Sequence, residues 1–295
     1  MKKVIFKGAG VALVTPMNED GSVNYEELER LINFQIDNGT DAIITCGTTG
    51  ESATLTEEEH SKVIEFTVNK VAGRIPVIAG TGSNNTETAL KHSLEAEKLG
   101  VDGLLIVTPY YNKTSQQGLI EHYTYIADRV HTPIILYNVP SRTGVNIKPE
   151  TYQILAKHEN IVAAKEASGD ISAVAKIISL CGDDLAVYSG NDDQIIPMLS
   201  LGGLGVISVF SNICPKECHT MIKEFFGGNT EAAAKMQIKY LELMNAMFCD
   251  VNPVPVKEAL NMMGFRCGEC RMPLYRLSDE NHRKLKSILE KYSLI

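Results

Sequence analysis

The stretch Ile161-Val162-Ala163-Ala164-Lys165-Glu166 is a short apolar run that ends in two charged residues. Its apolar part is continuous rather than alternating, which is typical of a parallel strand buried on both faces. Seven more such runs occur along the chain, each followed by small or polar residues and then by an amphipathic segment. The eight predicted strands are Gly10–Val14, Ala42–Thr45, Pro76–Ala79, Gly103–Val107, Pro133–Leu136, Ile161–Ala164, Leu185–Tyr188 and Gly205–Val209.

Helical patterns with start and stop signals lie between these strands. Asn24 with Glu27 and Thr56 with Glu59 have the spacing of capping boxes, and Pro149 suits a first helical turn. Three glycines stand near the predicted helix ends, where a glycine is favoured: Gly39, Gly73 and Gly100. Eight strand–helix alternations predict an α/β fold, the (β/α)₈ barrel. An open, doubly wound sheet has the same pattern and remains the alternative.

After Phe226 the pattern changes to helices alone. They are predicted at Thr230–Met247, Val256–Met263 and Ser278–Tyr292. Because a (β/α)₈ barrel typically takes ~250 residues, a chain of 295 residues leaves room for an addition. We therefore predict a catalytic barrel in residues 1–226 and a C-terminal helical domain, packed on the barrel, in residues 227–295.

Bulk composition excludes several classes of protein. The formal net charge of −8 and the lack of long basic runs argue against nucleic-acid binding. No run approaches the ~20 apolar residues of a membrane span, and the apolar start of the chain is too short for a signal peptide. The seven cysteines are an odd number scattered through a large chain, which favours reduced thiols and a cytoplasmic location.

In such barrels the active site forms at the C-terminal ends of the strands. Lys165 stands at one of these ends, directly after a buried run. An amine attacks a carbonyl only in its neutral form, and burial disfavours the charged form, so a strand-end lysine suits Schiff-base formation. Glu166 points to the opposite face of the strand and is not its direct partner. By position alone, a lysine that reaches the rim or pairs with a carboxylate is the simpler interpretation.

Other strand ends supply groups that suit carbonyl chemistry. Tyr137 and Tyr111 carry phenols that can transfer protons, and Thr48 could connect them in a relay. Thr49 and the neighbouring N–H groups could bind a substrate carboxylate, and the Arg142 guanidinium suits a second carboxylate. The alternative for Tyr111 is that it packs with Tyr110 as an aromatic pair at an interface. The alternative for Arg142 is a salt bridge that fixes its loop.

Metal chemistry is not supported by the sequence. No strand end carries a His-x-His or a carboxylate pair at ligand spacing. His60 and His92 fall in predicted helices, where we expect solvent-facing or capping positions. Cys267 and Cys270 form a C-x-x-C in the helical addition, without a second pair or nearby histidines. We expect neither a metal nor a disulfide there.

Phosphate binding is also poorly supported. Gly80-Thr81-Gly82 and Gly202-Gly203-Leu204-Gly205 are rich in glycine, but neither has the full dinucleotide or P-loop pattern. We expect both to serve tight turns. A strand-end lysine without a metal or a phosphate cofactor therefore points to covalent carbonyl chemistry.

Taken together, these motifs resemble the dihydrodipicolinate synthase family. The resemblance runs over nearly the whole chain, and its motifs are Gly47–Glu51, Tyr110-Tyr111, Tyr137–Gly144, Lys165-Glu166, Gly205–Ser208 and Asn252–Lys257. It implies a pyruvate-dependent lyase of the class I aldolase type, with no cofactor beyond a covalent Schiff base. Pyruvate would condense with L-aspartate 4-semialdehyde to 4-hydroxy-tetrahydrodipicolinate, the first committed step of diaminopimelate and lysine biosynthesis.

The same resemblance implies a role for each matching residue. Lys165 would form the Schiff base, and Tyr137, Thr48 and Tyr111 would relay protons, Tyr111 across a tight dimer interface. Thr49 would contact the pyruvate carboxylate and Arg142 the semialdehyde's carboxylate. Gly190 and Ile207 would line the pyruvate pocket. The resemblance also implies a homotetramer built as a dimer of dimers.

Lysine feedback is where the chain departs from the family pattern. The residues aligned with the inhibitor site are Ala53, Glu57, His60, Gly82, Asn84, Thr88 and Tyr110. In the enterobacterial pattern a histidine stands where this chain has Glu57. A glutamate, which would counter lysine's ammonium, stands where this chain has Thr88. Glu87 or Glu57 could substitute for that glutamate. We predict weak or absent feedback, which full inhibition by millimolar lysine would refute.

Two rival functions are weighed against this one. N-acetylneuraminate lyase and the 2-keto-3-deoxy sugar-acid aldolases share the lysine and the tyrosine but act on polyhydroxylated substrates. Arg142 and the double threonine favour the semialdehyde. A catalytically silent barrel would have lost a strand-end residue, whereas all of them are present here.

Overall fold

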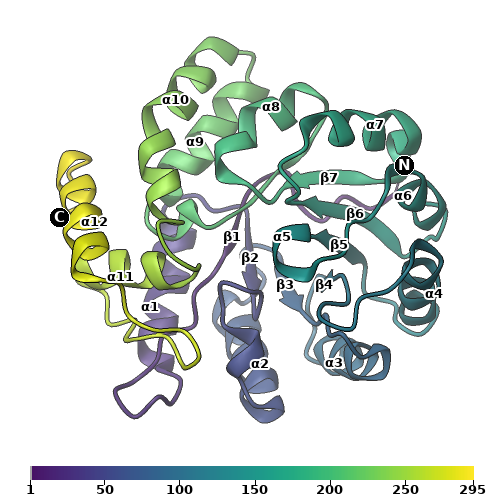
Figure 1. Ribbon diagram of the computed structural model, residues 1–295, viewed down its shortest axis with the longest axis horizontal. Helices are drawn as coiled ribbons and strands as arrows, with labels where there is room; N and C mark the ends of the chain where they lie inside the picture. The colour runs from purple at the N-terminus through teal and green to yellow at the C-terminus, as the bar shows by residue number, and fades with distance from the viewer. Residues whose placement is uncertain (1) are drawn as a thin grey trace.

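The computed structural model describes residues 2–295, in which eight parallel strands form a closed barrel in chain order (Figure 1). β1 pairs with both β2 and β8, which closes the ring. The strands are β1 (Gly8–Ala12), β2 (Ala42–Thr45), β3 (Val77–Gly80), β4 (Gly103–Val107), β5 (Ile134–Asn138), β6 (Ile161–Glu166), β7 (Ala186–Ser189) and β8 (Gly205–Ser208). The predicted barrel is confirmed, and the open sheet is excluded.

Helices surround the barrel (Figure 1). In residues 2–295 the α-helices are α1 (Tyr25–Asp37), α2 (Glu57–Val71), α3 (Thr86–Lys98), α4 (Gln116–Ala127), α5 (Pro140–Thr143), α6 (Pro149–Leu155), α7 (Ile171–Cys181), α8 (Ile195–Ser200), α9 (Pro215–Phe226), α10 (Thr230–Ala246), α11 (Val254–Met262) and α12 (Asp279–Lys291). Four short 3₁₀ helices complete the set: η1 (Ser52–Thr54), η2 (Gly182–Asp184), η3 (Asp192–Gln194) and η4 (Phe210–Asn212).

The helix signals in the sequence are largely confirmed. Thr56 and Glu59 form a reciprocal capping box at α2, and Pro149 is the first residue of α6. Asn24 caps α1 by accepting from the Glu27 N–H, but the Glu27 carboxylate binds Arg30 at 3.1 Å instead of completing a box. The three helix-end glycines adopt the left-handed conformation, with φ of 86° at Gly39, 73° at Gly73 and 83° at Gly100.

The largest error in the predicted strands is at β1, which begins at Gly8 rather than Gly10. Its ladder to β8 starts with the pair Gly8 and Gly205, before the most apolar part of the segment. Leu13 and Val14 remain buried beyond the end of the strand, and the Val14 N–H donates to the Asn212 side chain. The apolar run therefore extends past the ladder, so hydrophobicity alone misplaces the strand by two residues.

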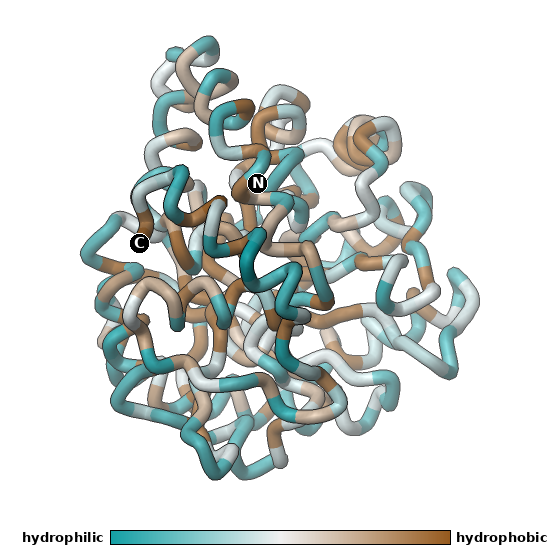
Figure 2. Tube along the Cα trace, turned by 60° about the vertical axis from the view of Figure 1, so that its left-hand side comes forward, coloured by the Kyte–Doolittle hydropathy of each residue, from teal (hydrophilic) through white to brown (hydrophobic). Residues whose placement is uncertain are grey.

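The buried apolar residues fall into two groups separated by the barrel wall. The smaller group fills the barrel and includes Ile135, Tyr137 and Ala163, whereas the larger group lies between strands and helices and includes Leu136 and Ala164. Neighbouring residues of a strand thus alternate between the two sides. The hydropathy colouring agrees, since apolar segments gather inside the molecule and polar ones at its periphery (Figure 2).

The C-terminal helices lie along one side of the barrel (Figure 1). α10 packs against α8 and α9, and α12 packs against α10 and α11. Among the residues described, no helix is both long and apolar enough to cross a membrane.

Candidate active site

A cavity of about 410 Å³ opens at the C-terminal ends of the strands. Five of the predicted site residues line it: Thr49, Tyr137, Arg142, Lys165 and Gly190. The other lining residues are Val139, Ser141, Ala167, Ser168, Asn191, Asp192, Asp193, Val209, Met244, Asn245, Phe248 and Asn252. The predicted convergence of strand ends on one mouth is confirmed for these residues.

Lys165 and Tyr137 are direct neighbours in this cavity. They are paired in the register of β5 with β6, and the lysine Nζ lies 4.3 Å from the centre of the tyrosine ring. The side of the strand that carries Lys165 faces the barrel interior, and the residue is only 6% exposed. Within residues 2–295, no ion pair joins Lys165 to a carboxylate. In residues 2–295 Lys165 is therefore neither at the rim nor paired with a carboxylate, which excludes both alternatives.

Glu166 faces away from Lys165, as predicted. Its carboxylate accepts hydrogen bonds from Asn138 Nδ2 at 3.0 Å, the Tyr152 hydroxyl at 2.9 Å and the Ser168 N–H at 2.8 Å. Burial and the adjacent Glu166 carboxylate raise the pKa of Tyr152 well above its ordinary value. Glu166 thus fastens the outer side of β6, and its charge is used there rather than at Lys165.

Gly190 makes room for the lysine. A Cβ at this position would lie 2.6 Å from Ala167 Cβ and 3.1 Å from Lys165 Cε. A larger residue would therefore displace the stem of Lys165, so this end of β7 tolerates only glycine without rearrangement.

Thr49 belongs to a tight turn that follows β2. The Glu51 N–H donates to the Thr48 carbonyl at 3.1 Å and closes the turn. The Thr15 hydroxyl, on the segment that follows β1, donates to the Gly50 carbonyl at 2.7 Å and ties the turn to the barrel. The hydroxyl of Thr49 is thus presented to the cavity by a turn that is anchored on both sides.

Asn252 connects two predicted site residues and was given no role from the sequence. Its side-chain Nδ2 donates to Thr49 Oγ1 at 3.0 Å, and its backbone carbonyl accepts from Arg142 Nη2 at 3.1 Å. The residue is 5% exposed and lies between α10 and α11. In the sequence it stood only as the first residue of the Asn252–Lys257 motif, between two predicted helices, so the C-terminal segment contributes more to the site than its pattern indicated.

Asp192 is a second residue that the sequence did not single out. It is 2% exposed, and its Oδ2 accepts from the N–H groups of Val209 and Phe210 at 3.0 and 2.9 Å. Burial raises the pKa of the Asp192 carboxyl, while these N–H groups and the Lys165 ammonium oppose that shift. The Asn-Asp-Asp run directly after a predicted strand was the available signal.

Three predicted residues do not line the cavity of a single chain. Thr48 is half-buried beside Thr49, and Ile207 is fully buried inside the barrel. Tyr111 is 89% exposed and has a left-handed backbone, with φ of 67°. Of the predicted proton relay, one chain therefore places only Tyr137 against the cavity.

The expectation that His60 is solvent-facing or capping is wrong. His60 is 5% exposed, and its Nε2 lies 2.8 Å from the carbonyl oxygen of Gly80. Its ring stacks on that of half-buried His92, with ring centres 4.8 Å apart. Burial lowers the pKa of both imidazoles. The two histidines pack between α2, α3 and β3 rather than facing water.

The two glycine-rich segments differ from each other. Gly202 has φ of 106° in a turn, as expected. Gly80 and Gly82 instead allow a close approach of the backbone, because a Cβ would lie 2.2 Å from the Cys46 carbonyl oxygen or 2.5 Å from the Val107 nitrogen. The expected tight turn at Gly80–Gly82 is therefore wrong.

The C-x-x-C motif lies in the loop between α11 and α12 rather than in a helix. The Cys267 carbonyl accepts from the Met17 N–H at 2.9 Å, so the loop reaches back to the start of the chain. Both thiols are free in the structure, and burial raises the pKa of Cys267 and Cys270 to about 12. They are therefore protonated at neutral pH.

The residues aligned with an inhibitor site are spread over η1, α2, α3 and the loops after β3 and β4. Glu57 is exposed and pairs with Lys91 at 2.5 Å, and the Asn84 carbonyl accepts from Asn112 Nδ2 at 3.0 Å. The other positions range from exposed Ala53 and Tyr110 to half-buried Gly82 and Thr88, with His60 buried as described above. Glu57 is therefore already paired with Lys91 in the isolated chain.

Comparisons with known proteins agree over nearly the whole chain. The model of the Dihydrodipicolinate synthetase family matches residues 5–292. A 4-hydroxy-tetrahydrodipicolinate synthase from Caldicellulosiruptor saccharolyticus is 55% identical over 290 residues, which cover 98% of each chain.

Solved structures give the same result for the fold. A dihydrodipicolinate synthase from Thermotoga maritima has a TM-score of 0.97 and 46% identity, covering 99% of this chain and 100% of the other. A chloride-inhibited dihydrodipicolinate synthase from Acinetobacter baumannii, solved in complex with pyruvate, has a TM-score of 0.97 and 41% identity over the same shares.

Proposed function

Because the chain belongs to the dihydrodipicolinate synthetase family and has 4-hydroxy-tetrahydrodipicolinate synthase activity in lysine biosynthesis, we propose that Lys165 forms a Schiff base with pyruvate. The observation that carries this proposal is a buried lysine that faces a cavity without an ion-pair partner in the described chain. Its Nζ attacks the keto carbon of pyruvate, and loss of water leaves an iminium. Loss of a methyl proton then gives the enamine nucleophile.

Proton transfer in these steps falls to Tyr137. Its ring lies beside Lys165 Nζ, so its hydroxyl is on the same wall of the cavity as the reacting carbon. A phenol can accept a proton from one group and donate it to another, as dehydration and enamine formation require. We propose that Thr48 and Tyr111 extend this relay toward solvent.

The carboxylates of the two substrates are assigned to different residues. Thr49 receives the carboxylate of pyruvate, since its Oγ1 accepts from Asn252 and its own proton remains to be donated. Arg142 receives the carboxylate of L-aspartate 4-semialdehyde, because its five N–H donors exceed the one bond it makes to Asn252. The enamine carbon bonds to the aldehyde carbon, and the substrate's amine then displaces Lys165 and closes the ring.

The relay requires a second copy of the chain. Tyr111 is a large aromatic residue that is almost wholly exposed and lies outside its own cavity. We propose that it enters the site of a neighbouring subunit, in a homotetramer built as a dimer of dimers. A cytoplasmic location and weak or absent feedback by lysine remain proposals from the sequence.

Borohydride trapping tests the Schiff base. Incubation with pyruvate and borohydride should increase the mass of the wild-type protein by one reduced adduct and abolish activity. The matched variant Lys165→Met, treated identically, should gain no mass. An adduct of equal yield in Lys165→Met would refute the assignment.

Steady-state kinetics test the carboxylate assignments. Thr49→Val should raise the KM for pyruvate, and Arg142→Leu should raise the KM for the semialdehyde. If Thr49→Val raised the KM for the semialdehyde and Arg142→Leu the KM for pyruvate, the two assignments would be wrong. Cleavage of sugar acids without semialdehyde condensation would contradict the choice of substrate.

A further inference from the structure

A fully buried ion pair lies beneath the turn that carries Thr49. Lys257 on α11 donates to Glu51 Oε1 at 2.8 Å, and both side chains are 1% exposed. The second Glu51 oxygen accepts from the Arg271 N–H at 2.9 Å, and Lys257 also donates to the Glu269 carbonyl at 2.9 Å. Two segments of the C-terminal region, α11 and the loop that follows it, therefore meet on one carboxylate of the turn after β2.

Glu51 is held in an unusual backbone conformation. Its φ of 55° and ψ of 35° are left-handed, which is costly for a residue with a Cβ. The same residue closes the turn through its bond to the Thr48 carbonyl. Such a conformation persists only when the surroundings enforce it, and here the ion pair and the Arg271 N–H act on the side chain of the strained residue itself.

We propose that Lys257 and Glu51 are positioning residues for pyruvate: their buried pair fixes the Thr48–Glu51 turn so that Thr49 meets the substrate carboxylate. The inference rests on the proposed role of Thr49. Neither residue lines the cavity, so both act through the turn. The C-terminal helices then serve the active site through two contacts, with Asn252 on the Thr49 hydroxyl and Lys257 on the Glu51 carboxylate.

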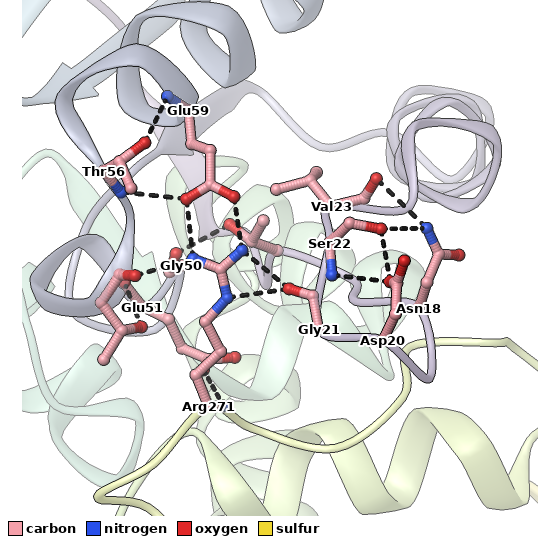
Figure 3. Close-up of polar contacts among 12 residues, drawn as sticks. Asn18, Asp20, Gly21, Ser22, Val23, Gly50, Glu51, Thr56, Glu59 and Arg271 are labelled. Atoms are coloured by element: carbon pink, nitrogen blue, oxygen red, sulfur yellow. Dashed lines mark hydrogen bonds and ion pairs between the residues drawn. The ribbon is translucent and has the colours of Figure 1, made fainter.

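A second link between the same two regions provides a matched control. The Arg271 guanidinium binds the Glu59 carboxylate on α2 at 2.5 and 2.7 Å and the Gly21 carbonyl at 2.7 Å (Figure 3). These contacts fasten the C-terminal loop to the barrel without touching the Thr48–Glu51 turn. Glu59→Gln weakens this link, keeps the backbone contact of Arg271 to Glu51, and preserves the α2 cap, because glutamine also serves in a capping box.

Kinetics of four variants test the proposal, with Thr49→Val as the reference. The double variant Glu51→Gln/Lys257→Met removes both charges without leaving either one unpaired. We expect it to raise the KM for pyruvate by roughly tenfold or more, with a smaller change in kcat, because a displaced Thr49 loses binding that is common to all steps. Glu51→Gln alone retains an acceptor and should give a smaller increase, which keeps the test open if the double variant does not fold.

Glu59→Gln should lower the melting temperature and leave both KM values within about twofold of wild type, because it removes no contact of the Thr48–Glu51 turn and keeps the Arg271 backbone N–H on Glu51. If Thr49→Val raises the KM for pyruvate but neither Glu51 variant does, the positioning role is refuted and the function of Thr49 stands. If Thr49→Val leaves the KM for pyruvate unchanged, both proposals fail. An equal increase in Glu59→Gln would mean that loosening the C-terminal region, rather than the buried pair, sets the KM.

Discussion

Two lysines of this chain are buried in opposite surroundings. Lys257 is 1% exposed, and a carboxylate and a carbonyl oxygen accept from its ammonium. Lys165 is 6% exposed and faces a cavity and a tyrosine ring, without an ion pair in the described chain. The first is enclosed by hydrogen-bond acceptors, whereas the second faces a cavity that can take a small substrate. Burial alone therefore does not distinguish the two lysines, but the cavity beside Lys165 does.

The largest effect is expected at the lysine that faces the cavity. Lys165→Met should lower kcat by a factor on the order of 10⁴ or more, because no other group can form the covalent intermediate. It should not lower stability, since it removes no ion pair and places an apolar side chain in a buried position. Turnover and urea unfolding measure the two quantities. If Lys165→Met retained substantial activity, Lys165 would not be the nucleophile that distinguishes it from Lys257.

The reverse pattern is expected at the other lysine. Lys257→Met leaves the Glu51 carboxylate buried without its counter-charge, which should cost about 3–5 kcal/mol of unfolding free energy. The control is Lys235→Met, which removes an exposed i,i+4 pair with Glu231 on α10 and should change stability little. Equal urea midpoints for the two variants would show that the buried pair does not stabilise the fold.

Removal of the Tyr137 hydroxyl tests which group of the cavity transfers protons. Tyr137→Phe keeps the ring beside Lys165 and removes the proton carrier, so kcat should fall by roughly 10²–10⁴-fold. Borohydride should still trap pyruvate on Lys165, although more slowly. A kcat within a few-fold of wild type would assign the proton transfer to another group.

The smallest effect is expected in acid. Hydrogen bonds from the Arg271 guanidinium lower the pKa of Glu59 from 4.5 to about 2 in the folded protein. Its contribution to stability is therefore complete above pH 4.5 and is lost as the pH falls through 2. Between these values the wild type should lose more unfolding free energy than Glu59→Gln, as urea titrations at each pH measure. If the unfolding free energies of the two proteins changed in parallel with pH, the lowered pKa of Glu59 would be contradicted.

The sequence predicted what depends on local pattern. Continuous apolar runs predicted the eight strands, start signals predicted the beginnings of α1, α2 and α6, and the position of Lys165 after a buried run placed it at the mouth. The division between residues 226 and 227 stays a prediction. Asn252 and Lys257 were quoted as the ends of a family motif but were given no role, because their partners Thr49 and Glu51 lie 203 and 206 residues away along the chain. No spacing rule connects residues so distant.

His60 shows a different limit. Its place in a helix was predicted correctly, but its environment depends on the neighbouring strand. The Gly80 carbonyl, at the end of β3, accepts a hydrogen bond from His60 Nε2. A buried histidine with a backbone partner has the same local sequence as an exposed one, so only the packing of α2 against β3 distinguishes them.

A crystal structure of the protein grown with pyruvate is the sharpest test of whether Lys165 forms the Schiff base. We expect continuous electron density from Lys165 Nζ to the keto carbon of pyruvate, with the carboxylate on Thr49 and the Tyr111 side chain of a neighbouring subunit at the mouth. Pyruvate bound without a covalent bond to Lys165, or joined to another lysine, would contradict it.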